Sequence, residues 1–114
     1  MGLKVKVIKQ LTARSALPGA WDSTTASGAV TLTKLSGQFQ QIDPGGAGRD
    51  VTLPDSQDGD FFVIANAADA AEALTVKDSA ASTIGSVSQN DMGIFYVDSV
   101  GAWQVFWMIS GAPS

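Results

Sequence analysis

The 114-residue sequence contains no cysteine and no histidine. The absence of cysteine excludes disulfides and thiolate metal sites. The absence of histidine removes the commonest zinc ligand and the usual general base near neutral pH, and it excludes a Ser-His-Asp triad. Catalysis would have to rest on carboxylates, lysine, tyrosine or serine. We therefore expect a non-enzymatic protein that holds no metal and no cofactor.

Charged residues are also scarce. They make up 16% of the chain, against 45% hydrophobic residues, whereas a typical soluble domain is about 25% charged. A chain of this length forms one domain, and it buries only about two thirds of the surface that its unfolded form exposes. The surplus apolar surface therefore needs a cover, and contact between identical subunits is the simplest one.

Long apolar runs are missing as well. No segment approaches the roughly 18 consecutive apolar residues that predict a membrane-spanning helix. The first residues, "MGLKVKVIKQ", alternate lysine with aliphatic residues and lack the apolar core of a secretion signal. Lys6 stands where a myristoylation motif requires serine or threonine. We expect a protein that is made in a cytoplasm, is not processed and does not contact a membrane.

The few charges are unevenly distributed. Lys4, Lys6, Lys9 and Arg14 precede the first acidic residue, Asp22, and from residue 15 onward three basic residues face eleven acidic ones. An acidic body repels nucleic acid, and four basic residues make a weak footprint for it. Two interpretations of the basic segment remain open. It is an arm that docks on an acidic protein surface, or its lysines protect the exposed side of an edge strand from aggregation.

Composition divides the chain at residue 28. Residues 1–28 contain the basic segment and a loop-like stretch rich in Ser, Thr, Gly and Pro, and residues 29–114 form the predicted β-domain. Short segments rich in β-branched and aromatic residues alternate there with turn signals, which predicts an all-β fold, a small antiparallel sandwich or barrel of about seven to eight short strands. The predicted strands span 29–35, 38–42, 50–54, 60–66, 73–78, 93–98 and 102–110. Residues 67–74 favour helix by composition but are too few for a stable one, so we expect a loop there.

The last two predicted strands form a hairpin around the turn Asp98–Gly101. On the second of them, alternate residues point to opposite faces, and one face is wholly apolar while the other is half apolar. A strand that is apolar on both sides is covered on both sides. A neighbouring subunit is a plausible cover in so small a domain.

Two motifs resemble binding sites but are better explained as turns. The glycines of "DPGGAGRD" (43–50) lead into a β-branched segment without the lysine and hydroxyl of a phosphate-binding loop, so we expect them to form a tight turn. Asp55, Asp58 and Asp60 lack the spacing and the bidentate glutamate of an EF-hand loop. A glycosidase-type carboxylate pair at Asp58 and Asp60 has no sign of a cleft around it. Aspartate and glycine are also the residues that surface turns require.

The order of segments from residue 50 to 107 reads "VTLPD", "GDFFVIAN", "ALTVK", "TIGS" and "GIFYVDSVGAW". This order resembles a β-module of tailed-bacteriophage virion proteins, which occurs in capsid decoration proteins, head fibres and tail fibres. The resemblance covers about half of the chain and implies a non-enzymatic, homotrimeric virion component, with "TIGS" as an Ile-Gly turn. Its scaffold positions are Leu53, Pro54, Gly59, Phe62, Ile64, Asn66, Thr75, Val76, Ile84, Gly85, Gly93 and Trp103. The residues we expect in the scaffold or the subunit interface are Leu53, Phe62, Ile64, Ile84, Phe95, Trp103, Phe106 and Trp107.

The function we expect is that of a capsid decoration, or cement, protein. Its homotrimer would bind the major capsid protein on the outside of a phage head and stabilise the lattice, and its location would be the outer surface of the virion. The arm is either a free attachment segment or the first strand of the domain. The alternative is a tail-fibre or head-fibre module in which exposed tryptophans stack on host-cell glycans. The capsid-binding residues we expect are Leu3, Lys4, Val5, Lys6, Val7, Ile8, Lys9, Arg14 and Trp21.

Overall fold

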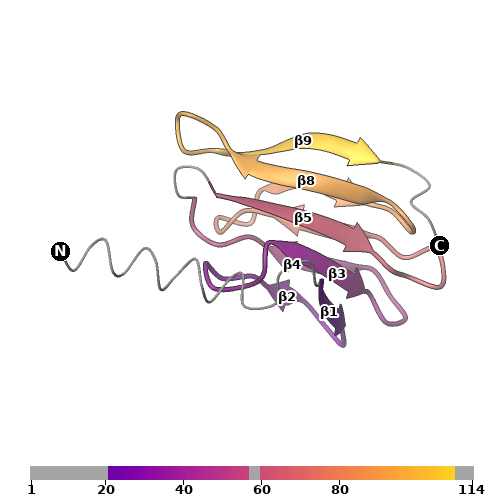
Figure 1. Cartoon of the computed structure of the whole chain (residues 1–114). Helices are drawn as coiled ribbons and strands as arrows, with labels where there is room; N and C mark the ends of the chain where they lie inside the picture. The colour runs from indigo at the N-terminus through magenta and orange to yellow at the C-terminus, as the bar shows by residue number, and fades with distance from the viewer. Residues whose placement is uncertain (1–20, 57–59, 110–114) are drawn as a thin grey trace.

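The computed structural model describes residues 21–56 and 60–109, with the backbone alone for 107–109. The described chain consists of nine strands in two mixed sheets, without a helix, so the predicted all-β class is confirmed (Figure 1). The five-stranded sheet has the order β1-β3-β5-β8-β9 and the four-stranded sheet the order β2-β4-β6-β7. The strands are β1 (Asp22–Thr25), β2 (Val30–Thr31), β3 (Phe39–Asp43), β4 (Arg49–Thr52), β5 (Phe61–Asn66), β6 (Leu74–Lys77), β7 (Thr83–Val87), β8 (Met92–Val97) and β9 (Trp103–Ile109).

The chain alternates between the two sheets from β1 to β6. Each strand is followed by one in the opposite sheet, so that β1, β3 and β5 are parallel neighbours, as are β2, β4 and β6. Only the pairs β5–β8, β6–β7 and β8–β9 are antiparallel. The expectation of an antiparallel sheet is therefore wrong, because short turns need not return the chain to the same sheet. A strand of the other sheet provides the crossover that parallel pairing requires.

Two strands lie where the sequence does not predict them. β1 belongs to the loop-like stretch before residue 28, yet it pairs with β3 in register from Asp22↔Gln40 to Thr25↔Asp43. β7 contains Ile84 and Gly85, which the resemblance implies to be a turn. Predicted strand 29–35 is reduced to Val30–Thr31, because the chain turns directly afterwards. Residues 67–73 connect β5 to β6 without a helix, as predicted.

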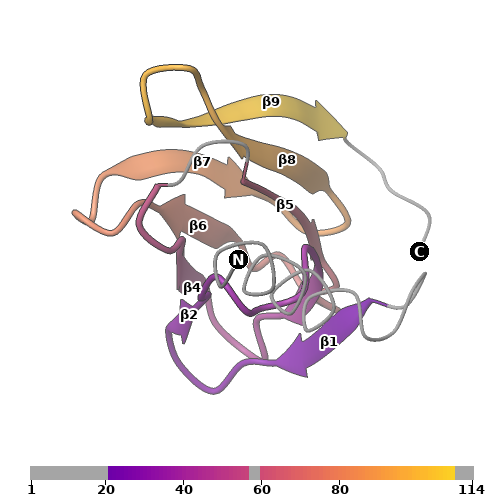
Figure 2. The same cartoon turned by 60° about the vertical axis from the view of Figure 1, so that its left-hand side comes forward.

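The core lies between the two sheets, and residues of both contribute to it (Figure 2). In β5 and β8 every second residue is buried, which is the period of a strand with one face on a core. Trp103 closes the core near the β8–β9 turn. Its ring lies 6.0 Å from that of Phe62, and its Nε1 donates a hydrogen bond to the carbonyl of Pro54 at 2.9 Å. The core residues are Ala26, Leu32, Ile42, Val51, Leu53, Phe62, Ile64, Leu74, Val76, Val87, Phe95, Val97 and Trp103.

The two hairpins are closed by aspartates in the same way. In the predicted β8–β9 turn, the Oδ1 of Asp98 accepts hydrogen bonds from the backbone N–H of Val100 and Ala102. In the β6–β7 turn, the Oδ1 of Asp78 accepts the equivalent bonds from residues 80 and 82. The fourth residue of each turn has a positive φ, which is 86° at Gly101 and 68° at Ala81. Aspartate therefore determines both turns by bonding the backbone that follows it.

Both hairpins contain a β-bulge. The register of β8–β9 changes between Ile94↔Trp107 and Phe95↔Val105, so that Phe106 is an additional residue on the edge strand. The register of β6–β7 changes in the same manner between Val76 and Lys77. A bulge inserts one unpaired residue and bends its strand. The simple alternation predicted along β9 is therefore interrupted at Phe106.

Candidate functional site

The structure separates the residues singled out from the sequence into three groups. Residues 3–14 of the predicted arm, and Asp58 of the acidic turn, lie outside the described residues. Trp21, the last residue proposed for capsid binding, is 40% exposed and stacks against Phe39 of β3 with ring centroids 5.4 Å apart. The third group is the set proposed for the scaffold or the subunit interface. Leu53, Phe62, Ile64, Phe95 and Trp103 are buried, and Ile84 packs against the core from one side.

Phe106 and Trp107 differ from the rest of that set. Phe106 is 70% exposed and meets the ring of Tyr96 edge-on, with centroids 5.7 Å apart. It is not part of the core, so the structure does not support a scaffold role for it. For Trp107 the structure gives only the backbone pairing with Ile94.

The outward face of the four-stranded sheet is polar. Its central position is Thr75, which lies between the buried Leu74 and Val76. Lys77 forms a salt bridge with Asp50 of the adjacent strand at 3.1 Å. We call this surface the polar face, and its residues are Thr31, Asp50, Thr52, Thr75, Lys77, Thr83 and Ser86. It has the composition expected of a sheet face in contact with water.

The outward face of the five-stranded sheet has the opposite composition. A row of paired residues crosses it from Phe39 through Val63 to Ile94, and a second row pairs Phe61 with Tyr96. We call this surface the apolar face, and its described residues are Phe39, Gln41, Phe61, Val63, Ala65, Met92, Ile94, Tyr96, Gln104 and Phe106. None of them carries a charge. The same side of the sheet continues beyond the apolar face, toward β1, with Ser23, Thr25 and the carboxylate of Asp43. The central parts of the two outward faces therefore differ strongly in polarity.

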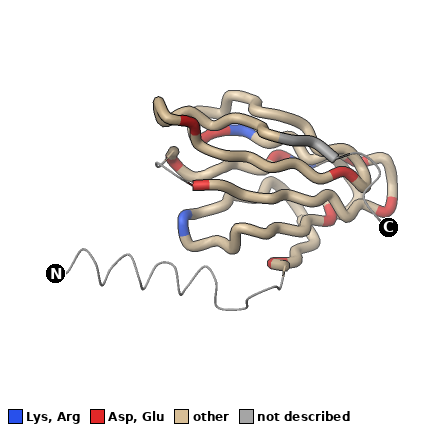
Figure 3. Tube along the Cα trace, turned by 45° about the horizontal axis from the view of Figure 1, so that its top comes forward, with Lys and Arg blue, Asp and Glu red and all other residues tan. Residues whose placement is uncertain are grey.

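Most acidic residues lie at strand ends and in turns (Figure 3). Asp43 is the last residue of β3, Asp60 precedes β5, and Asp91 and Asp98 flank β8 at its two ends. Asp60 is buried and accepts a hydrogen bond from the N–H of Phe61 at 2.9 Å. The acidic segment 55–60, interpreted from the sequence as a surface turn in preference to a calcium loop, thus includes an aspartate that accepts a hydrogen bond from the adjoining backbone.

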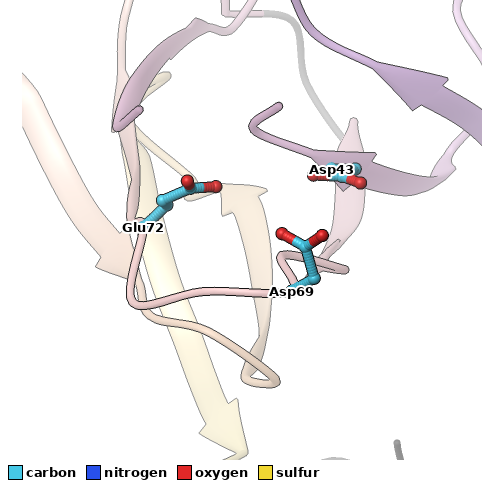
Figure 4. Close-up of side chains that lie close together, drawn as sticks. All are labelled: Asp43, Asp69 and Glu72. Atoms are coloured by element: carbon cyan, nitrogen blue, oxygen red, sulfur yellow. The ribbon is translucent and has the colours of Figure 1, made fainter. Parts of the chain in front are cut away.

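The fold brings together three carboxylates whose proximity the sequence does not reveal. The oxygens of Asp43, Asp69 and Glu72 lie within 4.8 Å of one another where the β3–β4 and β5–β6 loops meet (Figure 4). Carboxylate oxygens suit a hard cation such as Ca²⁺. Two of the three groups already accept backbone hydrogen bonds, Asp43 from Gly45 at 2.9 Å and Glu72 from Gly46 at 3.2 Å. The cluster therefore organises the two loops, and by itself it identifies no ligand.

The glycine-rich loop also bonds to groups of the chain itself. Gly45 and Gly46 have φ values of 74° and 112°, which confirms the tight turn expected there. Arg49 turns back onto the loop and donates from Nε to the carbonyl of Pro44 at 2.7 Å. A shallow depression of about 320 Å³ lies beside this loop, lined by Ser23, Thr24, Thr25, Gln41, Asp43 and Ala67. Its walls are hydroxyls, an amide and one carboxylate, without a cation to hold a phosphate.

Comparison with known proteins adds no family to these observations. No protein-family model matches the chain, and no curated protein is significantly similar to it. Within the described residues, no helix is long and apolar enough to cross a membrane. The resemblance to phage virion modules accordingly remains a prediction from the sequence.

Proposed function

We propose that the chain is a capsid decoration protein of a tailed bacteriophage. In this proposal it is a non-enzymatic homotrimer of small β-sandwiches on the outer surface of the virion, and it binds the major capsid protein. The observation that carries the proposal is the division of charge. The first 14 residues contain four basic residues and no acid, whereas the remainder has three basic residues against eleven acidic ones.

This division gives the two parts of the chain different partners. The basic segment is attracted to an acidic protein surface, and the acidic remainder is repelled from it, which orients the molecule with its β-domain outward. The alternation of Leu3, Val5 and Val7 with Lys4 and Lys6 suits a strand added to an exposed capsid sheet edge. Trp21, exposed where the described chain begins, supplies an aromatic anchor beside that segment.

The mechanism is thermodynamic linkage. A protein that binds the assembled lattice and not its dissociated subunits stabilises the lattice in proportion to the logarithm of its free concentration. Three basic segments on one trimer would bind with avidity, since the second and third contacts form at a high effective concentration. No chemical step is needed, in agreement with a chain that lacks histidine and cysteine.

The proposal is tested by co-sedimentation of the full chain with expanded phage heads. The variant Lys4→Glu/Lys6→Glu/Lys9→Glu is expected to lose binding, and wild-type binding is expected to weaken as salt is raised. The control is Lys34→Glu, which reverses a lysine of the β2–β3 connection and should bind as the wild type does. Undiminished binding of the triple variant, or no binding of the wild type to any head, would overturn the proposal.

A glycan-binding fibre module is the second candidate, and the Trp21–Phe39 pair favours it. Exposed aromatic rings stack on sugar rings, and these two lie at one border of the apolar face. Glycan-array binding that is lost in Trp21→Ala but kept in Val100→Ala, a change at the exposed tip of the β8–β9 turn, would support this function. An array without any bound glycan would contradict it.

A further inference from the structure

We infer that the apolar face is the surface through which copies of this chain associate. The strongest observation is the contrast with the polar face of the same domain. Outward positions at the centre of the four-stranded sheet are threonine, lysine, aspartate and serine, while the equivalent positions of the five-stranded sheet are phenylalanine, valine, isoleucine and methionine. Only one of the two surfaces has the composition of a face left in water.

The apolar face is continuous and does not consist of isolated exposed side chains. Its residues form continuous cross-strand rows over β3, β5 and β8, and Phe106 extends it over the edge strand β9. Phe39 and Phe106, at its two borders, are 41% and 70% exposed. Contiguous apolar surface of this kind marks an interaction site, and aromatic residues and methionine are enriched at such sites.

The lack of charge on the apolar face indicates which kind of partner covers it. An acidic or a basic partner would find no charge to pair with in the apolar rows of β3, β5 and β8. The partner's own charges would lose their hydration there without compensation. A second copy brings an identical uncharged face, while the carboxylates of both copies remain at strand ends such as Asp43, Asp91 and Asp98. Self-association therefore covers the face without bringing the acidic groups of two copies into its centre. The inference rests on the proposed function only for the number of copies, which is three. In such a trimer the apolar face of each copy would point toward the common axis.

The position of the bulge agrees with this use of the face. β9 is the edge strand of the five-stranded sheet. The additional residue at Phe106 bends that edge and places a large aromatic ring at the border of the face. Bulges of this type alter how an edge strand presents its side chains. In an assembly, Phe106 would reach the adjacent copy and the bent edge would leave β9 free of further strand pairing.

The first test is the mass of the full chain by analytical ultracentrifugation. Wild type is expected to sediment as an oligomer, and Ile94→Lys, which places a charge at the centre of the apolar face, is expected to sediment as a monomer. The matched control is Thr75→Lys, a half-buried outward residue in the middle of the polar face, which should keep the wild-type mass. A monomeric wild type, or an Ile94→Lys variant with unchanged mass, would overturn the inference.

A second measurement does not depend on whether the lysine variant folds. Because the chain has no cysteine, a single introduced thiol reports on one position. The thiol of Ala65→Cys is expected to react with a maleimide about ten-fold more slowly at high than at low chain concentration, since association follows mass action. The thiol of Ser86→Cys, on the polar face, should react at one rate throughout. If the thiol of Ala65→Cys instead reacts as fast as that of Ser86→Cys at every concentration, the face is uncovered and self-association through it is overturned.

These outcomes are separable from the test of the proposed function. A chain that oligomerises through the apolar face but does not bind phage heads refutes capsid decoration and leaves the inferred contact in place. A monomeric chain that binds heads through its first residues refutes the contact and leaves capsid binding in place.

Discussion

Asn66 connects the two sheets through a single side chain. It is the last residue of β5 and is 3% exposed. Its Nδ2 donates to the carbonyls of Val87, at the end of β7, and of Glu72, while its Oδ1 accepts from the N–H of Ala68. Replacement by alanine would leave two buried backbone groups and one half-buried group without these bonds. We expect Asn66→Ala to lower the free energy of unfolding by about 3 kcal/mol.

Urea unfolding of the full chain measures this loss. Gln89→Ala is the matched control, because Gln89 also has a side-chain amide near Ala68 but donates one longer hydrogen bond, from Nε2 to the Ala68 carbonyl at 3.3 Å. That change should cost less than about 1 kcal/mol. If both variants unfold at the same urea concentration, Asn66 does not join the sheets as inferred.

Ala81 adopts a backbone conformation that favours glycine. Its φ is 68°, whereas the equivalent turn position between β8 and β9 is Gly101 with a φ of 86°. A side chain is strained in this region, so we expect Ala81→Gly to raise the free energy of unfolding by about 0.5–1 kcal/mol. The reverse change, Gly101→Ala, should lower the free energy of unfolding by about 1 kcal/mol, because alanine is strained at this positive φ. The loss should not be larger, because the added Cβ meets no atom closer than the Oγ of Ser56 at 3.9 Å. Equal effects of the same sign in urea unfolding would contradict this account.

Asp98 links the stability of the β8–β9 turn to pH. The hydrogen bond from the Ala102 N–H, aided by Gln104 and by the N–H of Val100, holds the pKa of Asp98 below its ordinary value of 3.8. A folded pKa below the unfolded one means that the stabilisation is present above the unfolded pKa and is lost as pH falls through the folded pKa. We expect an NMR titration midpoint for the Asp98 carboxyl below that of an unfolded aspartate.

The variant Asp98→Asn provides the control for that titration. Its amide oxygen can still accept the turn bonds but does not titrate, so its melting temperature should fall less than that of the wild type between about pH 5 and pH 3. Parallel melting curves for the two proteins would show that Asp98 contributes nothing to the acid response.

At the scale of the elements, hydrophobic pattern predicts most strands but not their pairing. The segments that contain β5, β6 and β8 are recognisable because apolar β-branched and aromatic residues cluster in them. β1, with the sequence Asp-Ser-Thr-Thr, has no apolar residue, and all four residues are exposed, so no pattern marks it as a strand. The parallel pairing was unpredictable for a different reason: whether the next strand joins the same sheet depends on the direction in which a turn leaves, which composition does not encode.

β7 was missed because its glycine resembles a turn residue. In the structure Gly85 lies within the strand, and a Cβ placed on it would come within 3.3 Å of the Phe95 ring. Its function is close approach of the strand to the core. We expect Gly85→Ala to lower the free energy of unfolding by about 1–2 kcal/mol through overpacking, because the buried Phe95 has little room to move.

Gly28→Ala is the control for that substitution. A Cβ at Gly28 meets no atom within 4 Å, so thermal unfolding of this variant should resemble that of the wild type. A Gly85→Ala variant as stable as Gly28→Ala would mean that Phe95 repacks and that the glycine is not required for the contact.

The candidate sites were predictable to different degrees. The double-sided apolar character of the last strand predicted from the sequence that its outer face is covered. The run Phe61–Ala65 is apolar throughout as well, but it is not part of that prediction. The carboxylate cluster could not be found, because Asp43 and Glu72 are distant in sequence and only the crossing of two loops at one end of the sheets brings them together. The composition of a strand or loop can be read from the sequence. Which strands and loops become neighbours depends on how the chain alternates between the two sheets, which the sequence does not show.

At the scale of the whole molecule, self-association would make the stability of the fold depend on chain concentration. A ligand that binds only the folded state raises its stability, and here each copy acts as the ligand of the others. For a trimer, a ten-fold increase in chain concentration should raise the melting temperature by about 4 °C. Differential scanning fluorimetry of the full chain over two decades of concentration measures this slope.

The same experiment distinguishes the two faces of the molecule. Ile94→Lys should melt at one temperature regardless of concentration, because a charge on the apolar face removes the contact that links folding to association. Thr75→Lys lies on the polar face and should retain the wild-type slope. A wild-type protein whose melting temperature does not vary with concentration would mean that its small core is stable alone, and that the uncharged face of the five-stranded sheet is not what joins the copies.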